Sequence, residues 1–155
     1  MNTKQFPNPL PVTFSELVTI VDEQHTTQIM AMYDGKPAGC ISLRHTKFEK
    51  PHAQGGTDSF FYTVAYFYHL FVHECVRGHG VGRALVERCC LTAKLHGSTS
   101  ICLNVSAKNH IILPFYQKLG FVPGYEYPHP DATLILTKQL VPWTPVTPAP
   151  KEVAV

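Results

Sequence analysis

A glycine-rich turn between a strand and a helix constrains this chain more than any other stretch. An aromatic and β-branched run over Phe60–Val72 predicts a long strand, and the pattern over Val81–His96 predicts a helix that Gly97 ends. Between them stand Gly78, Gly80 and Gly82. Glycine lets an anion approach the backbone N–H groups, and the helix directs its positive end to the same place. The stretch predicts a phosphate-binding loop, although a plain structural turn also uses glycine.

Composition places the chain among single-domain globular proteins. Its 155 residues are 45% hydrophobic and 15% charged, enough to build a sizeable core. A formal net charge of +2, with Lys and Arg scattered, does not favour nucleic acid or a membrane surface as a partner. The longest apolar run is interrupted by His69 and is too short to span a bilayer, and residues 1–11 lack a signal-peptide pattern.

The number and spacing of the cysteines indicate whether the protein works in a reducing or an oxidising cellular compartment. They are odd in number, show no Cys-x-x-Cys spacing and fall within apolar segments. We therefore expect buried free thiols in a reducing compartment, and so a cytoplasmic location. The five are Cys40, Cys75, Cys89, Cys90 and Cys102.

Proline content divides the chain into three parts. Residues 1–11 carry three prolines and predict an extended arm. Residues 12–140 form the single domain, which holds every predicted strand and helix. Residues 141–155 predict a proline-rich tail that is disordered or loosely docked.

Two interpretations compete for residues 12–34. Apolar residues recur there at helical spacing, and Thr13 and Glu16 could form a capping box. The β-branched residues of Val18–Val21 and the alternation over Gln28–Tyr33 favour strands instead, and strands are the preferred interpretation.

A hairpin and a loop are expected next. The turn Asp34–Pro37 joins Thr27–Tyr33 to Ala38–His45 as a hairpin. The polar segment Thr46–Asp58 is expected to be a mobile loop before the long strand.

Alternation along that strand divides its side chains between two faces. One face is expected to carry Tyr66, Tyr68, Leu70 and Val72, and the other Phe67, His69, Phe71 and His73.

Downstream, Ser100–Val105 predicts a strand and Asn109–Leu119 a helix that Gly120 ends. Pro114 fits only the first turn of a helix, so regular helix should begin near residues 111–113. The last predicted strands are Phe121–Tyr127 and Thr133–Leu140.

This order of elements carries a known pattern. The stretch Arg77–Gly82 meets the acetyl-CoA motif of Arg or Gln, two residues, Gly, one residue, Gly or Ala. Asn109, followed by the Phe-Tyr-x-x-x-Gly-Phe of Phe115–Phe121, stands at the usual spacing of a later motif. On these residues the chain resembles the GNAT superfamily of N-acetyltransferases.

The resemblance implies a GNAT-like α/β (α+β) fold, with a mixed, mostly antiparallel twisted sheet, splayed parallel central strands and helices on both faces. Relatives usually have two helices between their first two strands. Too few residues precede the hairpin here, so we expect a shortened N-terminal helical region. One wall of the acceptor cleft would then be missing, or be supplied by the tail, a larger target or a second subunit, which makes a homodimer a candidate assembly.

The resemblance also implies an acetyl-CoA-dependent N-acetyltransferase that moves an acetyl group directly to a primary amine of a small molecule or peptide. Tyr116 is expected to protonate the departing thiolate, although it also fits a core position on an amphipathic helix. The residues expected to bind acetyl-CoA are Leu70, Phe71, Val72, Arg77, Gly78, His79, Gly80, Val81, Gly82, Arg83, Asn109 and Tyr116.

The general base is not evident, because no Asp or Glu occurs between Ser59 and His73. We hypothesise that Tyr66 and Tyr68 order a water that takes the amine proton, with Asn104 or a nearby carbonyl completing the relay. The alternative is that both tyrosines only line an apolar substrate pocket. Glu74 is expected to be a solvated rim residue rather than the base.

Metal binding is not expected, because no cysteine pair completes a ligand set with His69, His73 and His79. Numerous tyrosines near the predicted site favour an acceptor with an apolar or aromatic body, or a peptide amino terminus, over a polyamine. A non-catalytic acyl-CoA-binding sensor or interaction module is the rival function. A nucleotide-triphosphate loop is disfavoured, because no Gly-Lys-Ser or Gly-Lys-Thr follows the glycines.

Overall fold

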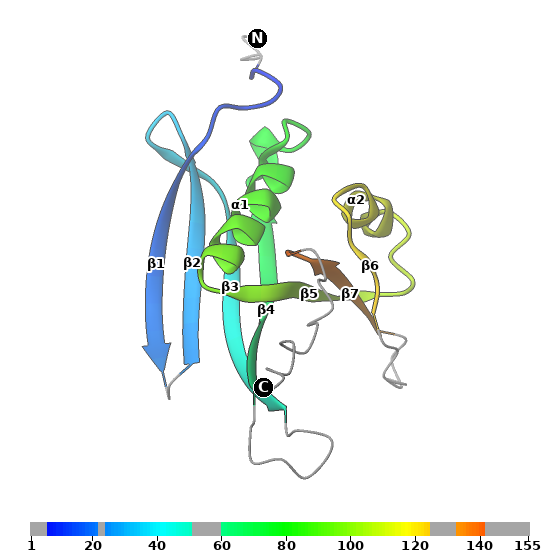
Figure 1. The fold of residues 1–155 in the computed structure, drawn as a ribbon. Coiled ribbons are helices and arrows are strands. Elements are labelled where there is room, and N and C mark those ends of the chain that lie inside the picture. The colour runs from blue at the N-terminus through cyan, green and yellow to red at the C-terminus, as the bar shows by residue number, and fades with distance from the viewer. Residues whose placement is uncertain (1–5, 22–23, 51–59, 125–132, 142–155) are drawn as a thin grey trace, which may run out of the picture.

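The computed structural model describes residues 6–21, 24–50, 60–124 and 133–141, which build one mixed sheet with two helices (Figure 1). The strands are β1 (Thr13–Val21), β2 (Gln24–Tyr33), β3 (Lys36–Lys50), β4 (Phe60–Val72), β5 (Ser98–Ser106), β6 (Val122–Pro123) and β7 (Thr133–Gln139). The helices are α1 (Val81–Leu95) and α2 (Ile112–Lys118), and a 3-10 turn, η1 (Glu74–Val76), follows β4.

Within the described ranges the sheet has seven strands, in the order β1-β2-β3-β4-β5-β7-β6. Only β4 and β5 run parallel, and every other neighbouring pair is antiparallel. The expected mixed, mostly antiparallel sheet with a central parallel pair is therefore confirmed.

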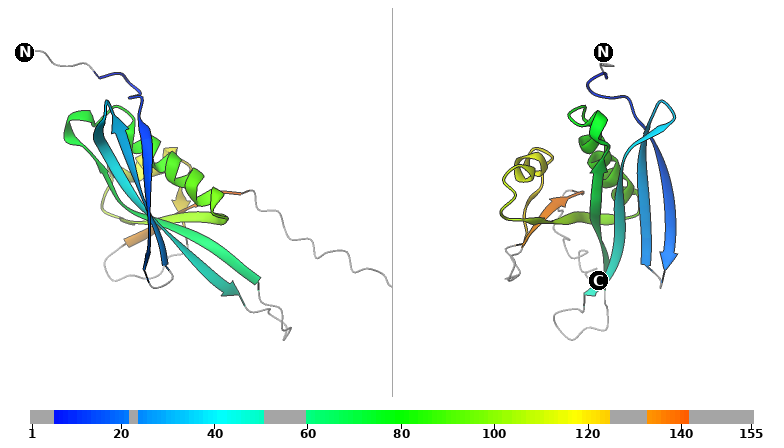
Figure 2. Two further views of the ribbon diagram at one scale, coloured as in Figure 1. Left: turned by 90° about the vertical axis from the view of Figure 1, so that its left-hand side faces the viewer. Right: turned by 180° about the vertical axis from the view of Figure 1, so that it is seen from behind.

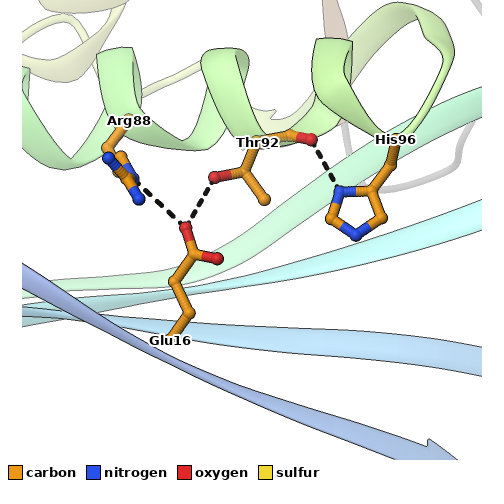
Figure 3. Close-up of polar contacts among 4 residues, drawn as sticks. All are labelled: Glu16, Arg88, Thr92 and His96. Atoms are coloured by element: carbon orange, nitrogen blue, oxygen red, sulfur yellow. Dashed lines mark hydrogen bonds and ion pairs between the residues drawn. The ribbon is translucent and has the colours of Figure 1, made fainter.

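The strand interpretation of residues 12–34 is correct. β1 and β2 pair as an antiparallel hairpin from Thr13↔Met32 to Val21↔Gln24, so no helices separate the first two strands. Glu16 does not cap a helix. Its Oε1 accepts hydrogen bonds from Arg88 Nε at 3.1 Å and Thr92 Oγ1 at 2.8 Å on α1 (Figure 3). This contact with a distant helix, which local spacing does not reveal, ties the edge of the sheet to α1.

The main core lies between α1 and the sheet. Figure 1 shows α1 laid across the strands, and it contacts β2, β3, β4 and β5. A Cβ on Gly39 would lie 3.0 Å from Leu85 Cδ1 and 2.5 Å from the Phe71 carbonyl, so glycine permits the close approach of helix and strand. The buried side chains of this core include Ile29, Ile41, Leu43, Phe67, Val81, Leu85, Val86 and Cys89.

The two parallel strands separate after a short pairing. β4 pairs with β5 only from Thr63↔Ser98 to Tyr66↔Cys102. Beyond this point β5 runs at a steep angle to β4 (Figure 1), while its other edge pairs with β7 from Ser100 to Ser106. The splay implied by the resemblance is present, and it leaves the backbone of β4 after Tyr66 unpaired on the side that faces β5.

The expected loop over Thr46–Asp58 is wrong in its first part. β3 continues to Lys50 and pairs with β4 as far as Lys50↔Phe60, forming a hairpin that projects from the sheet (Figure 2). β3 pairs with β4 along nearly its whole length, from Gly39↔Val72 to Lys50↔Phe60, and this pairing outweighs the polar composition. Residues 51–59 lie outside the described part of the chain.

The expected alternation along β4 fails at His69. Tyr68 pairs with Ser42 but Phe71 pairs with Cys40, so β4 carries one extra residue, and His69 has a positive φ of 53°. This β-bulge reverses the faces that follow it. Phe71 joins the face of Tyr66 and Tyr68, whereas Val72 turns towards α1.

The later elements follow the patterns closely. α1 spans Val81–Leu95 with Gly97 at a φ of 87°, and α2 begins at Ile112, which puts Pro114 in its first turn. β5 and β7 match their predictions, but the predicted strand Phe121–Tyr127 is confined to β6 among the residues that the structure describes. Residues 125–132 lie outside them.

Three sequence expectations concern the surface and the ends of the chain. All five cysteines are free, but the expected burial holds only for Cys89: Cys40, Cys90 and Cys102 are partly exposed, and Cys75 is exposed. No helix within the described ranges is both long and apolar enough to cross a membrane. The tail predicted over 141–155 lies, except for residue 141, outside the described part.

Candidate active site

The glycine turn after β4 forms a cradle at the start of α1. Gly78 and Gly80 have φ values of 82° and 80°, a backbone conformation that strains other residues. Gly80 is the N-cap of α1, and no side chain caps this end by a hydrogen bond. The first N–H groups of α1 therefore point out of the turn without a side-chain partner, which is the arrangement that binds phosphate groups.

Two arginines flank this turn, and both already have polar partners. Arg77 Nε donates to the Val72 carbonyl at 3.1 Å, which closes the turn back onto β4. Arg83 forms an exposed ion pair with Glu87, with an Nε–Oε1 distance of 2.9 Å. A ligand would meet the backbone of this loop more directly than either guanidinium.

The N-terminal arm docks onto the same turn, which the sequence did not predict. Leu10 N donates to the His79 carbonyl at 2.9 Å, and His79 Nδ1 donates to the Pro7 carbonyl at 3.2 Å. The Phe6 ring lies 5.7 Å from the His79 ring, and Leu10 is buried. The arm therefore holds His79 in place beside the two left-handed glycines.

A cavity of about 590 Å³ opens where β4 and β5 separate. It brings together five residues named from the sequence, and it adds Arg44 and His69, which the sequence did not single out as site residues. Local alternation does not identify Arg44, because only the register of β3 and β4 places it opposite Tyr66, and His69 depends on the bulge. The lining residues are Arg44, Tyr66, Phe67, Tyr68, His69, Leu70, Leu103, Asn104 and Tyr116.

Tyr66 and Tyr68 lie side by side in this cavity. Their rings stack with centroids 5.8 Å apart and an interplanar angle of 19°. Burial raises the pKa of Tyr66, the neighbouring Cys102 and Tyr68 add to this, and Arg44 opposes it. Tyr66 is thus a neutral phenol near pH 7, able to donate and accept hydrogen bonds but a poor base by itself.

Tyr116 combines a core position with access to the cavity. Its side chain on α2 is buried, and its ring lies 5.9 Å from that of Phe67 and 5.8 Å from that of Phe121. Burial raises the pKa of Tyr116 to about 12, so its hydroxyl keeps its proton at physiological pH. The two interpretations offered from the sequence, core residue and proton donor, are compatible.

The remaining predicted residues lie around this cavity rather than in it. Asn109 Oδ1 accepts a hydrogen bond from Ile112 N at 3.2 Å, so it closes the turn that leads into α2. Phe71 is half exposed, and Val72 lies beside Gly82. Neither residue is among those that line the cavity.

The histidines near the site have separate surroundings. His69 packs against Tyr68 with a ring separation of 4.8 Å, and His73 Nδ1 lies 3.1 Å from Cys75 Sγ. His79 belongs to the arm contact described above. Across the described ranges, no three His, Cys, Asp or Glu side chains are grouped so as to hold a metal ion.

Comparison with known proteins gives one family. The model of the acetyltransferase (GNAT) family matches residues 2–121. Glucosamine 6-phosphate N-acetyltransferase of Trypanosoma brucei brucei is 29% identical over 113 residues, which cover 72% of this chain and 71% of that protein.

Solved structures share the fold. A chain of the NatC complex bound to Gag peptide and CoA has a TM-score of 0.54 at 22% identity, covering 74% of this chain and 71% of that chain. Naa50 of Arabidopsis thaliana, in complex with a bisubstrate analogue, has a TM-score of 0.53 at 22% identity and covers 72% of each chain.

Proposed function

Since the chain belongs to the GNAT family of acetyltransferases, we propose that it transfers an acetyl group from acetyl-CoA directly to a primary amine of a small molecule or a peptide. The observation that carries this proposal is the splay of β4 and β5 beside an uncapped glycine turn, with a buried phenol at the opening. The names of the relatives support it, since one is an N-acetyltransferase of an amino sugar phosphate and another was solved with CoA.

The residues of the turn and of β4 fit acetyl-CoA, which supplies the acetyl group as a thioester when bound. Backbone N–H groups over Arg77–Gly82 would hold the pyrophosphate, because Gly78 and Gly80 leave them open. The free backbone edge of β4 would pair with the amides of the pantetheine arm. We assign this contact to Leu70, Phe71 and Val72, and supporting contacts to Arg83 and Asn109.

Tyr116 is the proposed general acid. Its hydroxyl would donate a proton to the sulfur as the carbon–sulfur bond breaks, so that neutral thiol leaves. A phenol with a pKa near 12 does not lose its proton to water at neutral pH, and it yields it only where negative charge develops. The aromatic rings of Phe67 and Phe121 hold this hydroxyl in a fixed place.

The amine must lose a proton before or during attack, because an alkyl ammonium with a pKa near 10 is about one part in a thousand neutral at pH 7. We propose that Tyr66 and Tyr68 order a water for this step, with Asn104 completing the relay, since all three line the cavity. His69 is a second candidate acceptor. It lines the same cavity, and its left-handed backbone is a type of strain that clusters at functional sites.

The pH–rate profile separates these candidates. If the relay operates, Tyr66→Phe and Tyr68→Phe together should shift the acidic limb of kcat/KM, where the rate rises with pH, or lower its plateau. If His69 is the base, His69→Gln should do so instead. An unchanged profile in the double tyrosine variant would refute the relay.

The function itself is tested by free-thiol release from acetyl-CoA in the presence of amines. Aminoglycosides, arylalkylamines, amino acids, polyamines and short peptides form the panel. Release that requires one class of amine would support the transferase and identify its acceptor. Cofactor binding with no release across the panel would favour a binding role.

Two finer expectations remain proposals. We propose a cytoplasmic location, since the five cysteines are free, as is usual in a reducing compartment. We also propose a homodimer formed through the open edge of β1, where Leu17 and Ile20 are more than half exposed.

A further inference from the structure

Arg44 places a positive charge inside the cavity whose tyrosines, in the proposed function, help to deprotonate the acceptor amine. It lies on β3 and pairs with Tyr66 of β4, so both side chains stand on the same face of the sheet. The adjacent Leu43 points the other way, into the core against α1. The guanidinium lines the cavity together with Tyr66, Tyr68, Asn104 and Tyr116.

Among the residues that the structure describes, this guanidinium has none of the polar partners that arginine normally has. Its Nε is buried and, among the described residues, has no hydrogen-bond partner. The guanidinium lies over the ring of Tyr68, whose centroid is 5.4 Å from the Arg44 Cζ atom. A cation–π contact leaves the N–H donors unused, and a half-buried cation without an anionic or hydrogen-bonding partner is unfavourable.

The other arginines of the chain differ from Arg44 in this respect, because each has a hydrogen-bonding or ionic partner. Arg77 donates to a backbone carbonyl, Arg83 pairs with Glu87, and Arg88 pairs with Glu16. Arg44 alone of the four has no such hydrogen bond or ion pair within the part of the chain that the structure describes.

The charge that Arg44 brings to the cavity is positive and has no negative counterpart among the described lining residues. No carboxylate is among the described residues that line the cavity, and none of these neutralises Arg44. A polyamine would bring further positive charge next to this guanidinium, which like-charge repulsion disfavours. A carboxylate or phosphate would supply the missing acceptor atoms, and the planar guanidinium binds either with two parallel hydrogen bonds.

We propose that Arg44 is a specificity residue that binds an anionic group, carboxylate or phosphate, on the same small molecule that carries the acceptor amine. This inference rests on the proposed function, because the cavity is an acceptor site only if the protein transfers an acetyl group to an amine. Pairing with Arg44 would fix one end of the acceptor at β3, so that its amine is held near Tyr66, Tyr68 and Tyr116. The aromatic walls then contact the body between the two groups.

Matched amines that differ by one anionic group provide the test. Ethanolamine is compared with phosphoethanolamine, and propylamine with 4-aminobutyrate, so that the two arms distinguish phosphate from carboxylate. For the wild type, kcat/KM for at least one anionic member should exceed that of its neutral partner by roughly 10- to 100-fold, the range of a charge-assisted hydrogen bond. Arg44→Gln should remove this preference, because it should lower kcat/KM for the anionic member far more than for its neutral partner.

Two further variants and one binding measurement sharpen the result. Arg44→Lys keeps the charge but not the planar fork and should retain part of the preference. Lys94→Gln, at an exposed position on α1, is the charge control and should retain all of it. Binding of phosphoethanolamine and 4-aminobutyrate is measured by calorimetry with each variant, independently of turnover, after circular dichroism has shown that it is folded.

The outcomes separate the two ideas. Acetylation of amines without an anion preference, or an equal loss for both members of a pair in Arg44→Gln, would overturn the anion site and keep the transferase. No thiol release, with anion binding that disappears in Arg44→Gln, would reject the proposed function and keep the anion site. Neither release nor Arg44-dependent binding would reject both.

Discussion

The hydroxyl of Tyr116 can be removed with little disturbance of the ring that carries it. We expect Tyr116→Phe to retain the fold and the affinity for CoA, because the ring still fills its place between Phe67 and Phe121. The turnover number should fall about 100- to 10,000-fold, the usual contribution of a positioned acid or base. Calorimetric titration with CoA and steady-state kinetics measure the two effects separately. Full activity in this variant would leave Tyr116 with a packing role only.

His45 should make the free energy of unfolding depend on pH in the acidic range. Its Nδ1 lies 3.3 Å from Ser98 Oγ, its ring stacks on that of His96, and its Nε2 is buried without a hydrogen-bond partner among the described residues. Burial, with smaller effects of His96 and His25, lowers the pKa of His45 from 6.5 to about 4. The unfolded chain therefore binds a proton at His45 below about pH 6.5, whereas the folded protein binds it only near pH 4.

Stability contributed by a neutral His45 should thus be present above pH 6.5 and decrease as the pH falls towards 4. Since the ring is half exposed, solvent screening makes the effect smaller than the full pKa shift would give. His45→Gln should flatten the pH dependence of the urea midpoint between pH 7 and 4.5, and His110→Gln, at an exposed site, should not. Parallel curves for wild type and His45→Gln would contradict this origin.

Single residues of the site were predictable where a motif or a run of neighbours identified them. Tyr66, Tyr68, Asn104 and Tyr116 were named from the sequence and meet in one cavity. His69 was considered only as a metal ligand, because a bulge in β4 is set by the pairing with β3 and has no local signal. Arg44 belongs to a strand far from the motif, so only the sheet register brings it to the site.

At the scale of elements, local sequence patterns predicted whether a segment is a helix or a strand better than they predicted where it begins and ends. The turns at Gly97 and Gly120 and the late start of α2 follow from glycine and proline geometry, which is local. The extension of β3 to Lys50 and the docking of Leu10 on His79 depend on partners distant in the chain. The choice of strand for β1 likewise depends on β2 and on the contact of Glu16 with α1.

The glycine turn offers a matched pair of substitutions. Gly80→Ala forces an alanine into a φ of 80°, which should destabilise the protein by about 1–2 kcal/mol and weaken CoA binding. Gly82→Ala lies within α1, where a Cβ would meet Val72 and Phe115 at ordinary distances of 3.5 and 3.6 Å, so it should be neutral or stabilise by up to about 1 kcal/mol. Urea unfolding of both variants measures the difference. Equal destabilisation would show that space, and not backbone conformation, governs the turn.

At the scale of the whole molecule, the direct β1–β2 hairpin leaves one side of the sheet open. β1 is the last strand on its side, and nothing in the described ranges pairs with its outer edge. Its large apolar side chains are more than half exposed at Leu17, Ile20 and Val21. Such an edge is a template for pairing with another strand, and a second copy of β1 fits it, because a two-fold axis through Leu17 brings no like charges together.

We therefore expect Leu17→Lys to convert a dimer into a monomer, since it would set two ammonium groups opposite each other at the two-fold axis. Light scattering coupled to size-exclusion chromatography, at concentrations from about 1 to 100 μM, spans the affinity range of weak and standard interfaces. Leu95→Lys is the matched control, because Leu95 is 77% exposed but lies on α1, away from the edge. A wild-type protein that stays monomeric throughout this range would refute the dimer, and loss of the dimer in Leu95→Lys would place the interface on α1 instead.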